Sequence, residues 1–153
     1  MKPKLLVSAC LLGTPCRYDG KSKKNEAVCA LAERFELIPV CPEVLGGLPT
    51  PRTPSERRGA CVVRKDGRDV TAEYRRGAEC ALETARREGA PATVPKERSP
   101  CCGSGEIYDG TFTGALTAGD GVTAELLKAN GITVYGEGEQ SLAEFLCSVS
   151  HST

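Results

Sequence analysis

The segment KLLVSAC, residues 4–10, is the stretch of sequence that most directly indicates the fold. Its short apolar run ends in small and polar residues, a pattern typical of a buried β-strand. The run is too short to be a signal peptide or to cross a membrane, because a spanning helix needs about 20 apolar residues. The segment therefore predicts a buried first strand whose carboxyl end carries Cys10.

Helices and strands alternate after this segment. Apolar residues at helical spacing predict a helix over 25–35 that is capped by Asn25, and another from residue 70 to Gly89 with Thr71 as its N-cap. The other expected elements are strands over 36–41, 92–94 and 132–135, a short strand over 60–64, a long surface loop over 46–59, a turn or hairpin within 106–114, and helices over 121–130 and 141–149, the last with Ser141 and Glu144 as a capping box.

This alternation predicts the architecture. Strands that alternate with helices form a mainly parallel sheet with helices on both faces. At 153 residues the chain has the size of one domain, since domains commonly run to about 100–150 residues. We therefore expect an α/β fold, a single Rossmann-like domain over residues 1–153.

Charge and cysteine content narrow the class of protein. The chain has 20 basic and 20 acidic residues and a formal net charge of zero, so it has no overall field to attract a polyanion, and we expect no obligate nucleic acid partner. Disulfide scaffolds are usually small secreted chains with an even number of cysteines. This chain has nine cysteines and no apolar leader. These features favour a reduced, cytoplasmic protein that is not bound to a membrane.

Five of the nine cysteines lie in segments punctuated by Gly and Pro: Cys10, Cys16, Cys41, Cys101 and Cys102. Cys10, Cys41 and the segment 99–102 each follow a predicted strand. In α/β sheets the ligand site lies beyond the carboxyl ends of the strands, so these three segments should meet at one edge. The other four cysteines lie within helix or strand patterns and are expected to fill the core: Cys29, Cys61, Cys80 and Cys147.

A soft metal centre is the chemistry that this arrangement favours. The only histidine is His151, near the C-terminal end, so a zinc site would need cysteine or carboxylate ligands. An iron-sulfur cluster is held by thiolates alone, and three dispersed thiolates would leave one iron open to a substrate atom. The candidate ligands at the strand ends are Cys10, Cys41 and Cys102, with Cys16 and Cys101 as neighbours or alternative ligands.

Polar residues accompany these cysteines. Glu43 follows Cys41 by two residues; it is either a solvated loop residue or, if partly desolvated, a general acid or base. Ser99 is either a turn residue or a hydroxyl that hydrogen-bonds a substrate or a water molecule. Three loop arginines would either bind an anion such as phosphate or be solvated: Arg52, Arg57 and Arg58.

Six ordered motifs resemble one bacterial family, the thiouracil desulfidases, which was long catalogued as a domain of unknown function. They are SACLLG at 8–13, CRYDG at 16–20, CPExxGGLPTPR at 41–52, KxRSPxCG at 96–103, YDGTF at 108–112 and GxGVTAxLL at 119–127. The motifs span nearly the whole chain.

This resemblance implies a 4Fe-4S cluster that is bound by three cysteines, here Cys10, Cys41 and Cys102. It implies an open iron that takes the sulfur of a thiolated pyrimidine, and roles in proton transfer and water handling for Glu43 and Ser99. The implied reaction is a non-redox, hydrolytic removal of sulfur from thiouracil or a related small base, nucleoside or nucleotide.

The chain departs from the family's pattern at one position. Where the family usually shows SPSCG, residues 99–103 read SPCCG, which places an extra thiol beside Cys102. Cys101 could take over ligation, cap the open iron or form a disulfide in a protein without the cluster. Related sequences can have another residue in place of Cys16, so Cys16 is expected to be a neighbour of the ligands.

Two other classes of function use the same residues. A zinc protein or a dithiol/disulfide redox protein would use the cysteines structurally or as a redox pair. A non-enzymatic nucleotide-binding module would use the loop arginines and residues 119–122, which resemble a phosphate-binding loop only weakly. Iron content and colour separate a cluster from zinc, and nucleotide binding that survives loss of Cys10 would indicate the module.

Overall fold

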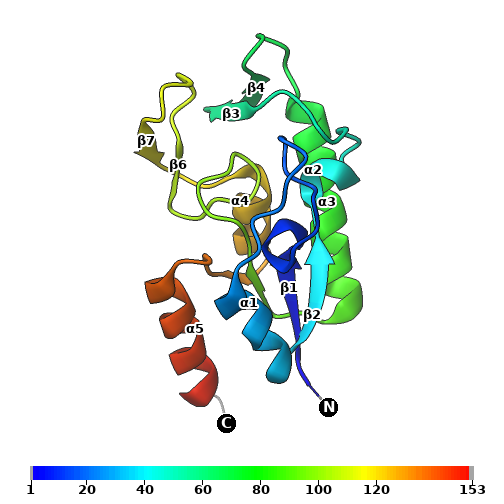
Figure 1. Cartoon of the computed structure of the whole chain (residues 1–153), viewed down its shortest axis with the longest axis vertical. Helices are drawn as coiled ribbons and strands as arrows, with labels where there is room; N and C mark the ends of the chain where they lie inside the picture. The colour runs from blue at the N-terminus through cyan, green and yellow to red at the C-terminus, as the bar shows by residue number, and fades with distance from the viewer. Residues whose placement is uncertain (1, 152–153) are drawn as a thin grey trace.

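A four-stranded parallel sheet forms the centre of the computed structural model, which describes residues 2–151 (Figure 1). Its strands, in their order across the sheet, are β2 (Glu36–Val40), β1 (Lys4–Ser8), β5 (Ala92–Val94) and β8 (Thr133–Val134). Every neighbouring pair is parallel. The structure confirms these four predicted strands and the parallel sheet, with β1 as one of its two central strands.

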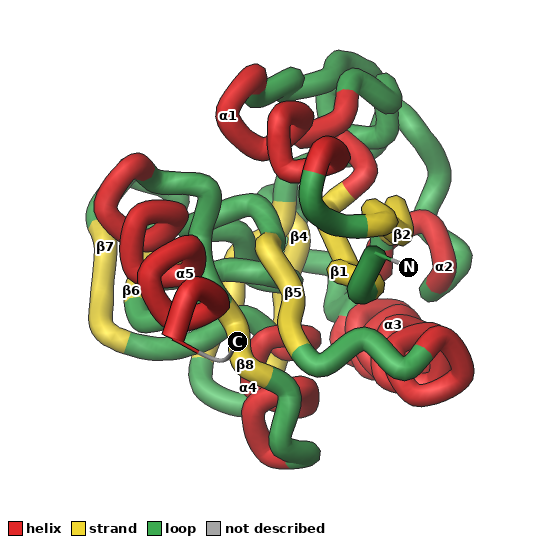
Figure 2. Tube along the Cα trace, turned by 90° about the horizontal axis from the view of Figure 1, so that it is seen from below, coloured by secondary structure: helices red, strands yellow, loops and turns green. Residues whose placement is uncertain are grey.

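Helices cover both faces of the sheet (Figure 2). Successive side chains of β1 point to opposite faces, and its apolar residues therefore need a covering layer on each face. Leu5 and Val7 belong to the core cluster on one face, whereas Leu6 packs on the other with Leu82 and Leu127. The first face carries α1 (Glu26–Cys29), the 3-10 helix Ala30–Glu33 and α5 (Glu139–His151), and the second carries α3 (Thr71–Glu88) and α4 (Val122–Ala129). The predicted α/β architecture is therefore confirmed.

A short helix, α2 (Pro42–Leu45), follows β2 and was not predicted. Proline at the first position of a helix loses no hydrogen bond, so Pro42 ends the strand and also starts α2. The helix packs on α3 backbone to backbone. A Cβ atom on Gly77 would lie 1.9 Å from the carbonyl oxygen of Pro42, and one on Gly46 would lie 2.0 Å from that of Glu73. Two glycines therefore set how closely α2 approaches α3.

Two antiparallel hairpins stand beyond the carboxyl ends of the sheet strands (Figure 1). One pairs β3 (Ser55–Arg58) with β4 (Cys61–Arg64), and the other pairs β6 (Glu106–Tyr108) with β7 (Leu116–Ala118). The expected loop over 46–59 is therefore wrong at its end, since residues 55–58 form β3. That strand is polar in sequence, and it forms because β4 lies three residues away to pair with it.

Local sequence predicts three helix N-caps, and the structure confirms one of them. The Asn25 cap is confirmed, since its Oδ1 accepts a hydrogen bond from Val28 N at 3.0 Å. Thr71 is instead the first residue of α3, and its Oγ1 accepts from Val62 N at 2.9 Å. Ser141 lies inside α5, and its Oγ accepts from Gly136 N at 2.7 Å. The last two caps were wrong because neighbouring segments use the hydroxyl groups.

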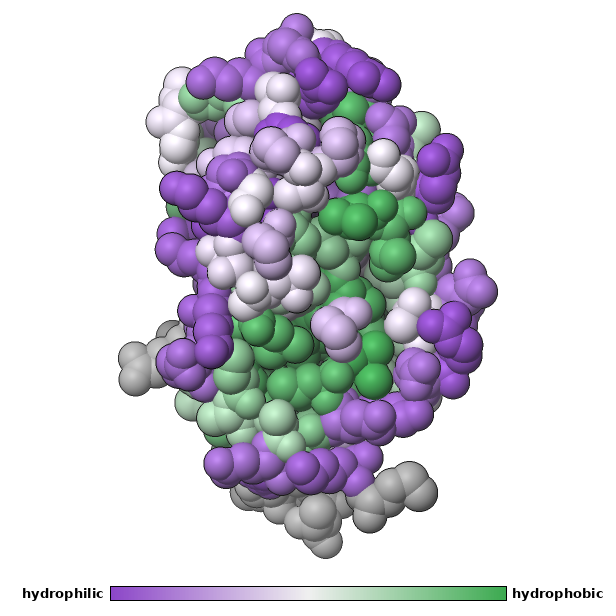
Figure 3. Space-filling model, turned by 45° about the vertical axis from the view of Figure 1, so that its right-hand side comes forward, coloured by the Kyte–Doolittle hydropathy of each residue, from purple (hydrophilic) through white to green (hydrophobic). Residues whose placement is uncertain are grey.

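Hydrophobic residues gather over the middle of the side on which β2 and α2 lie (Figure 3). Two of the exposed apolar side chains, Val44 and Leu45, belong to α2. Within residues 2–151, no helix is both long enough and apolar enough to cross a membrane.

Candidate functional site

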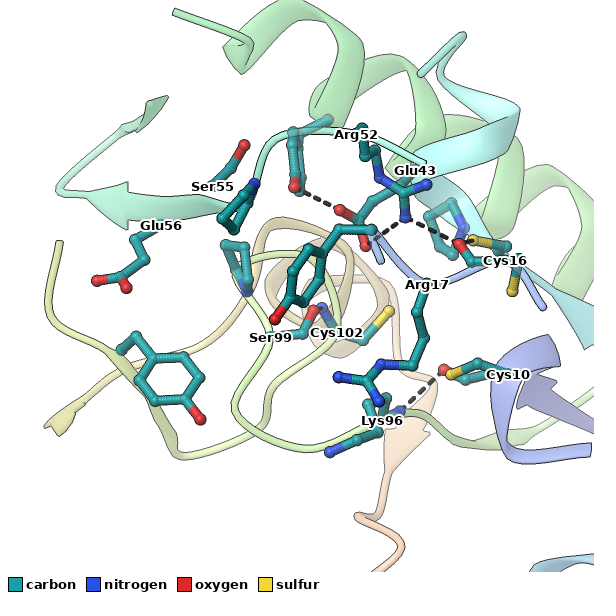
Figure 4. A pocket seen from close by; sticks show the side chains of 18 of the residues that line it. Cys10, Cys16, Arg17, Glu43, Arg52, Ser55, Glu56, Lys96, Ser99 and Cys102 are labelled. Carbon is teal, nitrogen blue, oxygen red and sulfur yellow. Dashed lines mark hydrogen bonds and ion pairs between the residues drawn. The ribbon is translucent and has the colours of Figure 1, made fainter. Parts of the chain in front are cut away.

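A cavity of about 430 Å³ lies between the carboxyl ends of the sheet strands and the two hairpins (Figure 4). Four thiols, three carboxylates and four basic side chains are among the groups that line it: Cys10, Cys16, Cys41 and Cys102; Glu43, Glu56 and Glu97; Arg17, Arg52, Lys65 and Lys96. The cavity therefore combines soft metal ligands with groups that can transfer protons and bind a polar ligand.

Three separate strand ends deliver the cysteines that were predicted as ligands. Cys10 lies in the 3-10 helix Ala9–Leu12 directly after β1, Cys41 is the N-cap of α2 directly after β2, and Cys102 lies in the loop that follows β5. Cys10 and Cys102 are buried and Cys41 is partly buried. All three line the same cavity, so the fold brings together thiols that are far apart in the sequence.

Cys16 is the direct neighbour of two of these thiols. A hydrogen bond with Cys16 lowers the pKa of the Cys10 thiol. A hydrogen bond with Cys16, together with burial, raises the pKa of Cys41 well above its usual range. Because metals bind the thiolate form, metal binding at this group of thiols must release protons.

Cys101 and Cys102 are adjacent in the sequence and belong to one core cluster, but they differ in their access to the cavity. Cys101 is fully buried, does not line the cavity, and has its Sγ 3.2 Å from Thr123 Oγ1. It packs in a core cluster with Val62 and Tyr74, and burial raises the pKa of its thiol. Cys102 is the one of the two that lines the cavity.

The loop that carries Cys102 is fixed from two sides. Ser99 Oγ accepts hydrogen bonds from Cys101 N at 3.0 Å and from Cys102 N at 2.9 Å. The first amide groups of α4 bond to the same loop, with Val122 N donating to Pro100 O and Thr123 N to Cys101 O. These amides are therefore not available to a phosphate group, which argues against the nucleotide-binding interpretation of residues 119–122.

Glu43 lies in the first turn of α2 and lines the cavity with its side chain 20% exposed. Its Oε1 accepts a hydrogen bond from Tyr74 Oη at 2.5 Å, and its Oε2 is 3.5 Å from a terminal nitrogen of Arg52. Glu43 is thus a paired, partly desolvated carboxylate at the cavity and not a freely solvated loop residue.

The three loop arginines have different positions. Arg52 lines the cavity, whereas Arg57 and Arg58 do not. Arg57 forms an ion pair with Glu125 at 2.6 Å, and Arg58 donates to Gly110 O at 2.8 Å. The last two therefore bind the protein's own acceptors, and only Arg52 fits the expectation of a cation at the site.

Glu56 fixes the tip of the second hairpin against the first. Its carboxylate is 9% exposed, and Oε1 accepts from Gly110 N at 2.9 Å and from Phe112 N at 3.2 Å. Phe112 lines the cavity with φ at 59°, a left-handed conformation that is rare for a bulky residue. Glu56 thus holds a strained backbone that places an aromatic ring at the cavity wall.

We expect Glu56→Ala to lower the free energy of unfolding by about 2 kcal/mol, because two amide groups lose their acceptor in a buried position. Glu56→Gln is the matched control, since its amide oxygen can accept the same bonds, and its loss should stay near 0.5 kcal/mol. Urea unfolding measures both. Equal losses in the two variants would contradict this role for the carboxylate oxygen.

No disulfide bond links any of the nine cysteines, all of which lie within residues 2–151. One expectation about the cysteines does not match the structure. Cys61 and Cys147 are exposed and Cys29 and Cys80 are partly buried, so the prediction that these four fill the core is wrong for the first two. Cys61 and Cys147 lie on the solvent side of β4 and α5. An apolar pattern in a short segment does not show which side of the element a residue faces.

Tyr74 has a role that the predicted helix from residue 70 to Gly89 does not reveal. It is 1% exposed, and its hydroxyl group reaches Glu43. The available signal was chemical: a tyrosine on an apolar face needs a partner for its hydroxyl group.

Comparison with known proteins decides the family. The family model for 2-thiouracil desulfurase matches residues 5–139. The chain belongs to this family. A solved structure of the 4Fe-4S-dependent thiouracil desulfidase TudS is similar to this desulfurase family member with a TM-score of 0.90 and 49% identity, over 97% of this chain and 99% of that one. The uncharacterized protein YbbK of Bacillus subtilis (strain 168) is 43% identical over 145 residues, which cover 88% of this chain and 96% of YbbK.

The thiols at the cavity of this desulfurase family member are donors of the kind that an iron-sulfur cluster takes. A zinc ion needs four ligands within about 2.3 Å of one point. Among the side chains that the structure describes, no group of three or more His, Cys, Asp or Glu residues converges to hold one metal ion. The three strand-end thiols line one cavity, and thiolates are the ligands that iron-sulfur clusters take. The donor set therefore fits an iron-sulfur cluster.

Proposed function

We propose that this protein removes sulfur from thiouracil and related small thiolated pyrimidines by non-redox hydrolysis. A 4Fe-4S cluster held by Cys10, Cys41 and Cys102 would serve the reaction, with Cys16 and Cys101 outside the ligand set. The observation that carries the proposal is the convergence of three strand-end thiols and the Glu43 carboxylate on one cavity. The similarity to TudS, whose name states both the cluster and thiouracil, supports it.

The proposed chemistry exchanges the sulfur of a thiocarbonyl group for the oxygen of water, so that the products are a carbonyl compound and hydrogen sulfide. When bound, the cluster supplies a Lewis-acidic iron site for the thiocarbonyl sulfur. The Glu43 carboxylate lines the cavity and accepts a proton from the attacking water. Ser99 Oγ already accepts two backbone hydrogen bonds, which leaves its own O–H to donate to the water or to the substrate.

The experiment is anaerobic reconstitution with iron and sulfide, a count of both per chain, and an assay of sulfide release from 2-thiouracil and 4-thiouracil. We expect the wild-type protein to release sulfide. Glu43→Gln should keep its iron content and lose about 100-fold or more in kcat, the usual contribution of a positioned general base. Glu36→Gln, at an exposed position of β2, is the matched control and should keep full activity. A wild-type protein with a full cluster and no sulfide release would refute the proposed function.

A further inference from the structure

Each carboxylate oxygen of Glu43 has its own partner. Tyr74 Oη donates to Oε1 at 2.5 Å. The Arg52 guanidinium lies on the other side, 3.5 Å from Oε2, and Figure 4 shows Arg52 beside Glu43. The two partners come from different segments, since Tyr74 belongs to α3 and Arg52 to the loop between α2 and β3. The carboxylate is therefore held from two directions and does not depend on one flexible contact.

Tyr74 cannot leave this contact without disturbing the core. Its ring is 1% exposed and packs with Val62 and Val70. It also lies one helical turn from Gly77, where α2 and α3 are in backbone contact, so the hydroxyl group and Glu43 belong to one rigid helix pair. Burial, and the nearby Glu43 carboxylate, raise the pKa of Tyr74 well above its usual range. The phenol therefore stays protonated and remains a donor.

Arg52 is fixed by acceptors other than Glu43. One terminal nitrogen donates to Pro49 O at 3.1 Å and to Thr50 Oγ1 at 3.0 Å, and the other donates to Cys16 O at 3.0 Å. Its side chain is 6% exposed. The guanidinium group thus connects Glu43 to the backbone of the loop that follows Cys10 and carries Cys16. The position of the carboxylate is therefore fixed relative to these two cavity thiols.

We propose that Tyr74 and Arg52 are positioning residues that hold the Glu43 carboxylate in its productive orientation toward the cavity. The inference rests on the proposed role of Glu43 as the proton acceptor. A general base must lie within about 2.6–3.2 Å of the proton that it takes, and a misplacement of about 1 Å can cost about 100-fold in rate. A residue that only orients the base lowers kcat and leaves substrate binding largely unchanged.

The first test replaces Tyr74 by phenylalanine, which keeps the buried ring and removes only the hydroxyl group. We expect kcat to fall about 10-fold with KM within about twofold and with unchanged iron content. Arg52→Lys keeps the charge but loses the planar guanidinium group, whose two terminal nitrogens bind acceptors on different sides. This variant should show a decrease in kcat of similar size. Tyr135→Phe removes a hydroxyl group from a ring that packs on Phe145, outside the cavity lining, and it should retain wild-type kinetics.

A double-mutant cycle separates positioning from a general structural effect. If Tyr74 acts through Glu43, then Tyr74→Phe should lower kcat in the wild-type background and change it by less than about twofold in the Glu43→Gln background. An equal loss in both backgrounds, or full activity of Tyr74→Phe, would overturn the inference.

A second cycle needs no cluster and no activity. In cluster-free protein, Tyr74→Phe should lower the urea midpoint when Glu43 is present. It should have a much smaller effect on the midpoint beside Glu43→Ala, where the buried hydroxyl group has lost its carboxylate acceptor. Equal shifts in both backgrounds would contradict the contact. If Glu43→Gln retains full activity while this cycle shows the coupling, the failure lies in the proposed role of Glu43 and not in the Tyr74 contact.

Discussion

Cys102→Ser should abolish both the cluster and sulfide release, whereas Cys101→Ser should keep both. The two thiols are neighbours in the sequence, but only Cys102 lines the cavity, while Cys101 is fully buried with its Sγ 3.2 Å from Thr123 Oγ1. A serine hydroxyl at position 101 retains that partner, so the buried polar group stays satisfied. A serine at position 102 cannot replace the thiolate that an iron site requires.

Iron and acid-labile sulfide per chain, measured after anaerobic reconstitution, test this pair of variants. We expect wild-type values for Cys101→Ser and values near zero for Cys102→Ser. Cys101→Ala is the second variant if the serine lowers solubility, since alanine adds no polar group to the core. The opposite pattern, in which loss of Cys101 removes the iron, would show that the extra thiol has replaced Cys102 as the ligand.

Gly77→Ala should destabilise the protein, although it adds only one methyl group. In the middle of an exposed helix, replacement of glycine by alanine stabilises by about 1 kcal/mol. At position 77 the new Cβ would lie 1.9 Å from Pro42 O, so α2 must move away from α3. We expect a loss of about 3 kcal/mol in the free energy of unfolding. The sign of the change therefore tests whether the two backbones are in contact.

The same displacement should reduce activity, because α2 carries Glu43 and is capped by Cys41. Urea unfolding of the cluster-free protein and kcat of the reconstituted enzyme measure the two effects. Glu79→Ala, at an exposed position of the same helix, is the control and should shift stability by no more than about 0.5 kcal/mol. A stabilised, fully active Gly77→Ala variant would contradict the packing of α2 on α3.

Sequence patterns sufficed where the determinants are local. The apolar run before Cys10 predicts β1, and the alternation of strands and helices then predicts a parallel sheet. The carboxyl ends of parallel strands meet at one edge. For this reason the convergence of Cys10, Cys41 and the segment 99–102 could be anticipated without coordinates.

The remaining features depend on contacts between distant segments. Tyr74 is 31 residues from Glu43, so no local pattern connects them. The helix α2 is only four residues long, too short for a periodic pattern to appear. Cys101 and Cys102 belong to one core cluster, and only Cys102 also lines the cavity. This difference depends on the turn that Ser99 caps.

The attachment of α4 to the loop 99–103 has a consequence for the position of Cys102. The carbonyl groups of Pro100 and Cys101 accept the first amide groups of α4, and a Cβ atom on Gly121 would lie 2.4 Å from the carbonyl carbon of Cys101. Ser99 Oγ binds the amide groups of residues 101 and 102 on the other side of the loop. The backbone around Cys102 is therefore held by contacts that do not involve its own side chain. A substitution at position 102 should change the donor atom at the cavity and leave the course of the loop unchanged.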